Sequence, residues 1–254
     1  MKHVPSISIS EDSLTNKNIL ITGATSGIGK SLTKYLSEHG ANILMLSKDE
    51  SKLDILYDEI VKKYNTDPCI FKCDLQKLNE DSAIEINKII NENYSGIDAV
   101  IFNAAALDKM SHIESYDLAT WEKILKINLT SIFLIAKNLI PLLKESSNPR
   151  IIFTTSSVGK KGKAFWGAYS VSKAGLNVLS EIIADEVESV SNIKVFNFDP
   201  KATRTKMRSL AYPAENPNTI KEPLKLMDYY LWMLSEDSSS SNEILIEYRS
   251  DKFR

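Results

Sequence analysis

The feature that most constrains the fold is a glycine-rich turn between a short apolar run and an amphipathic segment. Residues 18–22 read Asn-Ile-Leu-Ile-Thr, and Gly23, Gly27 and Gly29 follow at once. A strand that enters a helix through such a turn places backbone N–H groups where they can hold a phosphate. The pattern therefore predicts a strand–turn–helix unit with a dinucleotide pyrophosphate at the helix N-terminus. A tight turn without a ligand is the alternative that the glycines alone leave open.

Short apolar runs alternate with helical patterns along the rest of the chain. This alternation indicates an α/β fold, a doubly wound parallel sheet of about seven strands with helices on both faces. We expect strands at residues 18–22, 41–46, 69–73, 99–102, 151–154, 193–198 and 244–247, and helices at 28–39, 50–63, 81–93, 121–143 and 168–190.

Three details of this assignment can be compared with a structure. Residues 202–223 have little periodicity and contain Pro213 and Pro217, so we expect an irregular lid over a binding site. Thr120 is the expected start of the helix at 121–143. The serine run Ser238–Ser241 is expected to be a surface loop before the last strand.

Composition excludes several classes of protein. The chain has 254 residues, 43% of them hydrophobic and 25% charged, which suits a single domain at 1–254. Its net charge of −2 gives no basic face for nucleic acid. Residues 1–8 lack an apolar core of signal-peptide length, and the apolar stretch 132–143 is too short and too polar to span a bilayer. We therefore expect a cytoplasmic protein without a membrane partner.

The cysteines and histidines do not form a metal-binding pattern. Cys69 and Cys73 lie in one expected strand, and none of the three histidines, His3, His39 and His112, has ligand spacing to them. We expect no metal site, and we expect the two cysteines to be buried small side chains.

A tyrosine and a lysine one helical turn apart suggest acid–base chemistry. Tyr169-Ser-Val-Ser-Lys173 places both side chains on one helix face, and Ser156 precedes them. A nearby ammonium group favours phenolate, so Lys173 is expected to lower the pKa of Tyr169 and make it a usable general acid or base. An ordinary pair on the helix surface is the alternative.

The end of the second strand bears on the choice of cofactor. NAD sites typically carry Asp or Glu about 20 residues after the glycine turn, where it holds the ribose 2′-hydroxyl. This chain has Leu46-Ser47-Lys48 there, and the adjacent cation favours NADP(H), with NAD(H) as the alternative. Lys48 as a solvated lysine, with Asp49 supporting the next helix, is the other interpretation.

Polar residues also follow the third and fourth strands. Asp74 is a candidate acceptor for the adenine amino group, or a turn residue, and Asn103 is a candidate tie between strands, or an ordinary loop residue. The full set expected to contact the cofactor is Gly23, Thr25, Ser26, Gly27, Ile28, Gly29, Ser47, Lys48, Asp74, Leu75, Asn103, Ala104, Ala105, Tyr169, Lys173, Pro200, Thr203 and Thr205.

These motifs, in this order, resemble those of the short-chain dehydrogenase/reductase family over about residues 18–247. Segments 157–162, 166–169 and 203–207 further resemble the YciK-type bacterial oxidoreductases. The family likeness rests on the cofactor turn Thr22–Gly29, on Asn103-Ala-Ala for an Asn-Ala-Gly motif, and on Asn128, Ser156, Tyr169 and Lys173 at the positions of the helix asparagine and the catalytic residues.

The resemblance implies a Rossmann fold and an oxidoreductase acting on CH–OH or C=O groups. Tyr169 would exchange the proton and Ser156 would stabilise the substrate oxygen. Lys173 would also hold the nicotinamide ribose, and Asn128 would hold a water that links Lys173 to solvent. Thr203 and Thr205 are candidates for holding the carboxamide. The family likeness further implies a homodimer or homotetramer through the helices at 121–143 and 168–190.

Two positions depart from the family pattern. Ala105 stands where glycine is usual, and Lys201, in Asp199-Pro-Lys, stands where Pro-Gly is usual. A non-glycine residue is disfavoured if position 201 needs positive φ. The departures motivate two alternatives: a protein that senses NADP(H) without turnover, and an interaction partner that binds no nucleotide.

The substrate is expected to be a small carbonyl or alcohol. Two basic clusters flank the expected site and suggest an anionic molecule, such as a phosphate-bearing acyl carrier, while solvated surface charge is the alternative. Phe165 and Trp166 form an apolar wall, or else belong to the core. The clusters are Lys160, Lys161 and Lys163, and Arg204, Lys206 and Arg208.

Overall fold

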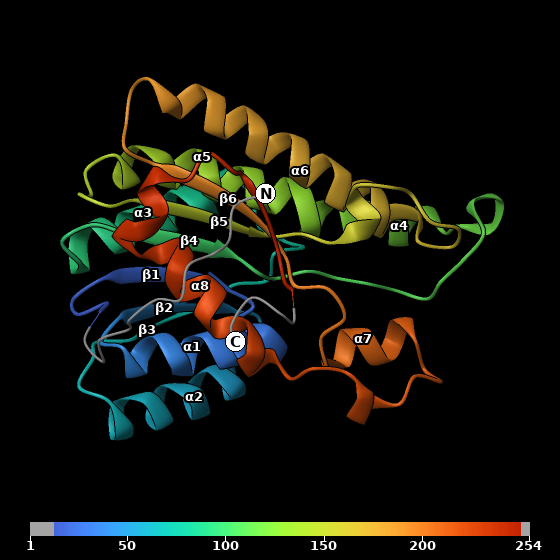
Figure 1. Ribbon diagram of the computed structural model, residues 1–254, viewed down its shortest axis with the longest axis horizontal. Coiled ribbons are helices and arrows are strands. Elements are labelled where there is room, and N and C mark those ends of the chain that lie inside the picture. Colours follow the sequence, from blue (N-terminus) through green and yellow to red (C-terminus); the bar gives the residue numbers. More distant parts are fainter. Residues whose placement is uncertain (1–12, 250–254) are drawn as a thin grey trace.

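Seven parallel strands form one sheet in the computed structural model, which describes residues 13–249 (Figure 1). The strand order is β3-β2-β1-β4-β5-β6-β7, which confirms the expected fold class. The order changes direction between β1 and β4, so their carboxyl ends open a crevice where such sheets bind ligands. The strands are β1 (Asn18–Thr22), β2 (Asn42–Ser47), β3 (Cys69–Lys72), β4 (Ala99–Phe102), β5 (Arg150–Thr154), β6 (Lys194–Asp199) and β7 (Leu245–Glu247).

Helices cover both faces of the sheet (Figure 1). One core cluster packs α1, α2 and α8 against the sheet, and a second packs α3, α5 and α6 against the opposite face. The helices are α1 (Gly27–Glu38), α2 (Glu50–Lys63), α3 (Glu80–Asn93), α4 (Leu118–Leu125), α5 (Ser131–Leu143), α6 (Gly167–Glu188), α7 (Lys206–Ala211) and α8 (Met227–Leu234).

Strand β1 shows why these strands lack a polar face. Ile19 and Ile21 contact one layer of helices, and Leu20 contacts the other. All three are at most 1% exposed. A parallel strand buried on both faces is apolar along its whole length, which explains the continuous apolar runs in the sequence.

The start of the long helix differs from the expectation. Helix α4 begins at Leu118, because the carboxylate of Asp117 accepts a hydrogen bond from the backbone N–H of Thr120. Thr120 is therefore the donor to the cap and not the cap itself. A π-helical turn at Lys126–Thr130 then separates α4 from α5.

The serine run is only partly a surface loop. Ser238 is fully buried, and its hydroxyl accepts a hydrogen bond from Arg150 Nε at 3.2 Å. Arg150, itself 1% exposed, also donates to the carbonyls of Met233 at 3.0 Å and Ser235 at 2.9 Å. This guanidinium joins the start of β5 to the end of α8, a helix that the sequence patterns did not predict.

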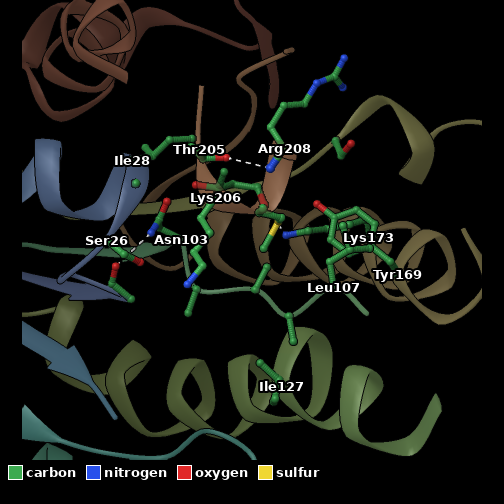
Figure 2. Close-up of a pocket in the computed structure, with 18 of the residues that line it drawn as sticks. Ser26, Ile28, Asn103, Leu107, Ile127, Tyr169, Lys173, Thr205, Lys206 and Arg208 are labelled. Carbon is green, nitrogen blue, oxygen red and sulfur yellow. Dashed lines mark hydrogen bonds between the residues drawn. The ribbon is translucent and has the colours of Figure 1, made fainter. Parts of the chain in front are cut away.

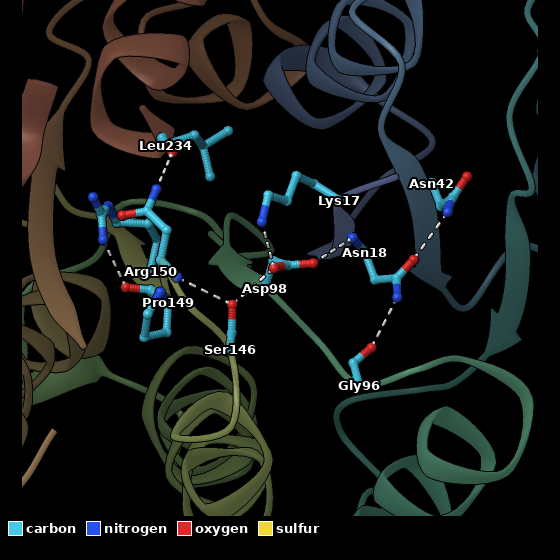
Figure 3. A network of polar contacts seen from close by, with 10 residues as sticks. Lys17, Asn18, Asn42, Gly96, Asp98, Ser146, Pro149, Arg150 and Leu234 are labelled. Atoms are coloured by element: carbon cyan, nitrogen blue, oxygen red, sulfur yellow. Dashed lines mark hydrogen bonds and ion pairs between the residues drawn. The ribbon is translucent and has the colours of Figure 1, made fainter. Parts of the chain in front are cut away.

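A polar network lies beside Arg150 at the amino ends of the strands (Figure 3). Asp98 accepts hydrogen bonds from Lys17 Nζ at 3.0 Å, from the Asn18 backbone N–H at 3.0 Å and from Ser146 Oγ at 2.7 Å. These contacts hold β1, β4 and β5 together at the end opposite the crevice.

The continuous helical stretch Leu118–Leu143 is longer than the apolar segment 132–143 considered above. Its length and its hydropathy of 1.4 would also suit a membrane span. Here, however, its buried side chains, among them Ile135 and Leu139, pack on the sheet in the second core cluster. The first eight residues, for which no signal peptide is expected, lie outside the described range.

Candidate active site

The glycine turn has the geometry of a phosphate-binding loop. Gly23 has φ +69°, which other residues rarely adopt. A Cβ on Gly29 would lie 2.1 Å from the Gly23 carbonyl oxygen, so only glycine fits. Ser26 precedes α1 without a side-chain cap, so the first N–H groups of the helix are free to meet a ligand.

The end of β2 is consistent with Lys48 as a cofactor contact and with Lys48 as a solvated lysine beside a helix cap. The hydroxyls of Ser47 and Thr25 hydrogen-bond at 2.9 Å, which joins the two loops. Lys48 is exposed and lines the cavity. Asp49 caps α2 by accepting a hydrogen bond from the Lys52 N–H at 3.2 Å, so its carboxylate has a structural task.

Asn103 ties neighbouring strands together, as one interpretation of the sequence held. Its backbone N–H donates to Thr22 Oγ1 at 3.1 Å, and its amide donates to the Thr22 carbonyl at 3.2 Å. Asp74 accepts a hydrogen bond from the Gln76 N–H at 3.0 Å and also lines the cavity. Asp74 therefore stabilises a turn and also lies where it can meet a ligand.

Ser156, Tyr169 and Lys173 come together at the carboxyl end of β5. Tyr169 is 7% exposed and Lys173 is 1% exposed. Lys173 Nζ donates to the Thr154 carbonyl at 2.6 Å and lies 5.9 Å from the centre of the Tyr169 ring. The ammonium group is thus fixed beside the phenol, at the floor of the cavity.

The pKa values differ from the expectation. Burial, with a further contribution from the charge of Asp199, raises the pKa of Tyr169 to about 12, and a hydrogen bond with Ser156 acts the other way. Burial lowers the pKa of Lys173 to about 8. The sequence predicted a lowered pKa for Tyr169, and that expectation is wrong for the protein alone, because burial of the phenol disfavours its charged form.

Asn128 lies in the π-helical turn and supports the site from behind. Its side-chain oxygen accepts a hydrogen bond from the Ala106 N–H at 2.6 Å, and its amide donates to the Ala106 carbonyl at 2.9 Å and to Ser172 Oγ at 3.1 Å. Asn128 therefore joins the loop after β4 to α6 at Ser172, which is next to Lys173 and three residues after Tyr169.

One cavity of about 730 Å³ contains nearly all the predicted site residues. Figure 2 shows Ser26 and Asn103 toward one end, Tyr169 and Lys173 toward the other, and Lys206 pointing into the space between them. Of the predicted residues, Gly29 and Asn128 do not line the cavity and lie behind its wall. The cavity also contains residues that the sequence motifs did not assign to it, among them Leu107, Lys123, Thr154, Thr155, Val158, Met207, Leu210 and Tyr212.

The lid begins with the two predicted threonines. Thr203 Oγ1 donates to the Pro200 carbonyl at 3.0 Å, and Thr205 Oγ1 accepts a hydrogen bond from the Arg208 N–H at 3.2 Å. A Cβ on Gly27 would lie 3.2 Å from Thr205 Cγ2, so the lid lies directly on the glycine turn. Helix α7 follows, and gives this part of the lid more order than expected.

Most of the basic side chains near the site have partners. Lys160 pairs with Glu247, Arg204 with Glu222, and Arg208 makes two hydrogen bonds of 2.6 Å to Glu215. Lys163 donates to the hydroxyl of Tyr212 at 3.1 Å. The carboxylate pairs neutralise three of the six basic side chains in the two clusters.

Comparison with known proteins decides the family. The family model for short chain dehydrogenases matches residues 17–216. The chain belongs to the short-chain dehydrogenase/reductase family. The uncharacterised oxidoreductase YciK of Escherichia coli is 32% identical over 228 residues, 90% of each chain, which confirms the resemblance to YciK-type proteins.

Two further relatives are informative. A short chain dehydrogenase of Shigella flexneri 2a, solved in complex with NADP, is 31% identical, with a TM-score of 0.89 over 94% of this chain and 99% of the other. A benzil reductase of Bacillus cereus, which forms (S)-benzoin, is 27% identical over 89% of each chain. This short-chain dehydrogenase/reductase is therefore an oxidoreductase on a Rossmann fold.

Proposed function

We propose that this protein is an NADP(H)-dependent oxidoreductase that reversibly reduces a carbonyl group to an alcohol. The observation that carries the proposal is the convergence of Ser156, Tyr169 and Lys173 with the glycine turn in one cavity. The turn fits a dinucleotide, since Gly29 leaves room for close approach of the backbone and the first N–H groups of α1 lack side-chain caps.

The chain's own residues supply the acid–base chemistry. Tyr169 gives its phenolic proton to the carbonyl oxygen, and the Ser156 hydroxyl hydrogen-bonds the same oxygen and stabilises its developing charge. Lys173 lies beside the phenol and holds positive charge there. Asn128 positions α6 through Ser172. NADPH, when bound, supplies the hydride.

A cofactor titration tests the first half of the proposal. Lys48 is exposed at the end of β2, where it can meet a 2′-phosphate, and the relative from Shigella flexneri was solved with NADP. We expect NADPH to bind more tightly than NADH, measured by nicotinamide fluorescence. Lys48→Ala should weaken NADPH selectively, while Lys62→Ala, on the exposed face of α2, should not. Equal affinity for both nucleotides in all three proteins would contradict the preference.

Turnover tests the second half and separates the enzyme from a non-catalytic sensor. Tyr169→Phe removes the proton donor and should lower kcat about 10² to 10⁴-fold while NADPH still binds. The ammonium of Lys201, whose position motivated the sensor alternative, is bonded to Asp199 and Glu247. Binding of NADPH without turnover on any carbonyl would favour the sensor.

The substrate end of the cavity favours an apolar, aromatic carbonyl compound. The Trp166 ring lies 5.5 Å from that of Tyr169 and 6.0 Å from that of Tyr212, and Leu107 and Met207 also line the space. Three of the six basic side chains in the two clusters, Lys160, Arg204 and Arg208, pair with carboxylates, which weakens the case for an anionic substrate. We expect higher kcat/KM for benzil than for acetoacetyl coenzyme A, and a selective loss for benzil in Trp166→Ala. The reverse order would support the anionic alternative.

A further inference from the structure

Lys201 adopts a backbone conformation that lysine rarely takes. Its φ is +55°, directly after β6, and its backbone N–H donates to Asp199 Oδ1 at 2.9 Å. Its ammonium donates to the other carboxylate oxygen, Asp199 Oδ2, at 2.7 Å. One carboxylate therefore binds both ends of the residue and holds it in the left-handed conformation.

The same ammonium group reaches a second strand. Lys201 Nζ lies 2.9 Å from Glu247 Oε1, and Glu247 also pairs with Lys160, four residues after Ser156. Bonds to Lys160, then to Lys201, lower the pKa of Glu247 to about 2. Burial alone would lower the pKa of Lys201, but its bonds to Asp199 and Glu247 raise it above the ordinary value. These salt bridges thus join β7 to the start of the lid and to the loop that carries Ser156.

Asp199 is the carboxylate of this cluster that lines the cavity. Its side chain is 3% exposed. The groups that face it are Lys201 from the turn, Lys221 from the end of the lid, and Tyr169 from α6. Glu247 and Lys160 lie one contact further away, and Lys173 lies beside Tyr169 on α6. The charge of Asp199 already raises the pKa of the Tyr169 phenol, and without a paired cation it would oppose ionisation of the phenol more strongly.

We propose that Lys201 is a positioning residue that neutralises Asp199 beside Tyr169 and clamps the start of the lid to β7. The proposal rests on the oxidoreductase function proposed above. Alcohol oxidation needs Tyr169 as the phenolate base. Loss of the Lys201 charge exposes Tyr169 to more of the Asp199 charge, so oxidation should require higher pH.

The pH dependence of alcohol oxidation separates this role from simple support of the fold. Lys201→Gly removes the charge while glycine adopts positive φ freely. We expect the profile of kcat/KM, at saturating NADP, to move to higher pH by about one unit. Lys201→Arg should keep the wild-type profile, and Asp199→Asn combined with Lys201→Gly should restore it. An unmoved profile in Lys201→Gly would overturn the electrostatic role.

Hydrogen–deuterium exchange tests the clamp without catalysis. Residues 200–212 and 244–248 should exchange faster in Lys201→Gly and in Lys201→Asn, which accepts positive φ without the charge, but not in Lys201→Arg. Equal exchange in all four proteins would overturn the clamp. If the wild-type protein oxidises or reduces no substrate, the proposed function fails by itself, and exchange then decides the clamp.

Discussion

Replacing Gly159 by alanine should push the serine loop away from the helix that carries Tyr169 and Lys173. A Cβ on Gly159 would lie 2.8 Å from the Lys173 carbonyl carbon and 2.9 Å from the Lys173 Cβ. Ordinary contacts between carbon atoms lie at about 3.5 to 4.0 Å, so the two segments must separate by roughly 0.7 to 1.2 Å.

The size of the effect follows from this displacement. Overpacking of this kind costs about 1 to 3 kcal/mol of unfolding free energy. For a domain of this size, that lowers Tm by roughly 2 to 12 °C. A catalytic group displaced by about 1 Å loses on the order of 100-fold in rate. A 100-fold loss of rate corresponds to about 2.7 kcal/mol, so the loss of activity should be comparable in free energy to the loss of stability.

The assay compares Gly159→Ala with Gly162→Ala in the same loop. A Cβ on Gly162 meets no atom within 4 Å, so this variant should keep wild-type activity and remain within about 0.5 kcal/mol of wild-type stability. Steady-state kinetics and thermal unfolding are measured for both variants. Wild-type kcat/KM in Gly159→Ala would refute the conclusion that this contact positions Lys173.

Three further predictions concern stability, pH and assembly. Arg150→Met should cost about 3 kcal/mol in denaturant unfolding, because it removes buried charge-assisted hydrogen bonds to the carbonyls of Met233 and Ser235, without changing kcat; a loss below 1 kcal/mol would contradict the role of that network. Lys173 has a pKa of about 8 when folded and 10.5 as an ordinary lysine, so the unfolded chain binds more protons between these values and stability should rise with pH there. Lys173→Met should remove that part of the slope in unfolding titrations, and an unchanged slope would refute the assignment. We also propose a homodimer or homotetramer through α5 and α6, whose Phe133, Val178 and Ile182 are 46 to 55% exposed; Ile182→Arg should reduce the mass in light scattering, and a monomeric wild type would contradict the interface.

The regular elements were predictable because their signals are local. The continuous apolar runs and the glycine stops lie within one element each, and most predicted bounds agree with the structure within two residues. Helix α8 was not predicted, because Met227–Leu234 is almost entirely buried and shows no polar face. We expected Cys69 and Cys73 to be buried, but both are half-buried because β3 is an edge strand. Their partial burial still raises the pKa of both thiols.

The residues that form the cavity wall depended on contacts between distant segments. Tyr212 and Met207 join Tyr169 only because the lid folds back over the glycine turn at Thr205. No periodicity in 202–223 marks these side chains, so the sequence predicted a lid but not which residues face the substrate. The pairing of Arg208 with Glu215 was likewise absent from the charge pattern, which had suggested free cations.

The sequence by itself determined the layered fold and the glycine turn, and it predicted Ser156, Tyr169 and Lys173 as catalytic residues, because backbone sterics, burial and helix spacing act over a few residues. Only the tertiary structure decided the pKa shifts of Tyr169 and Lys173 and the conformation of Lys201. Packing of β5, β6, β7 and α6 buries the side chains of Tyr169 and Lys173. The same packing brings Asp199 and Glu247 within salt-bridge distance of Lys201. Electrostatic energy depends on distances and burial in three dimensions, and a linear sequence does not contain those distances.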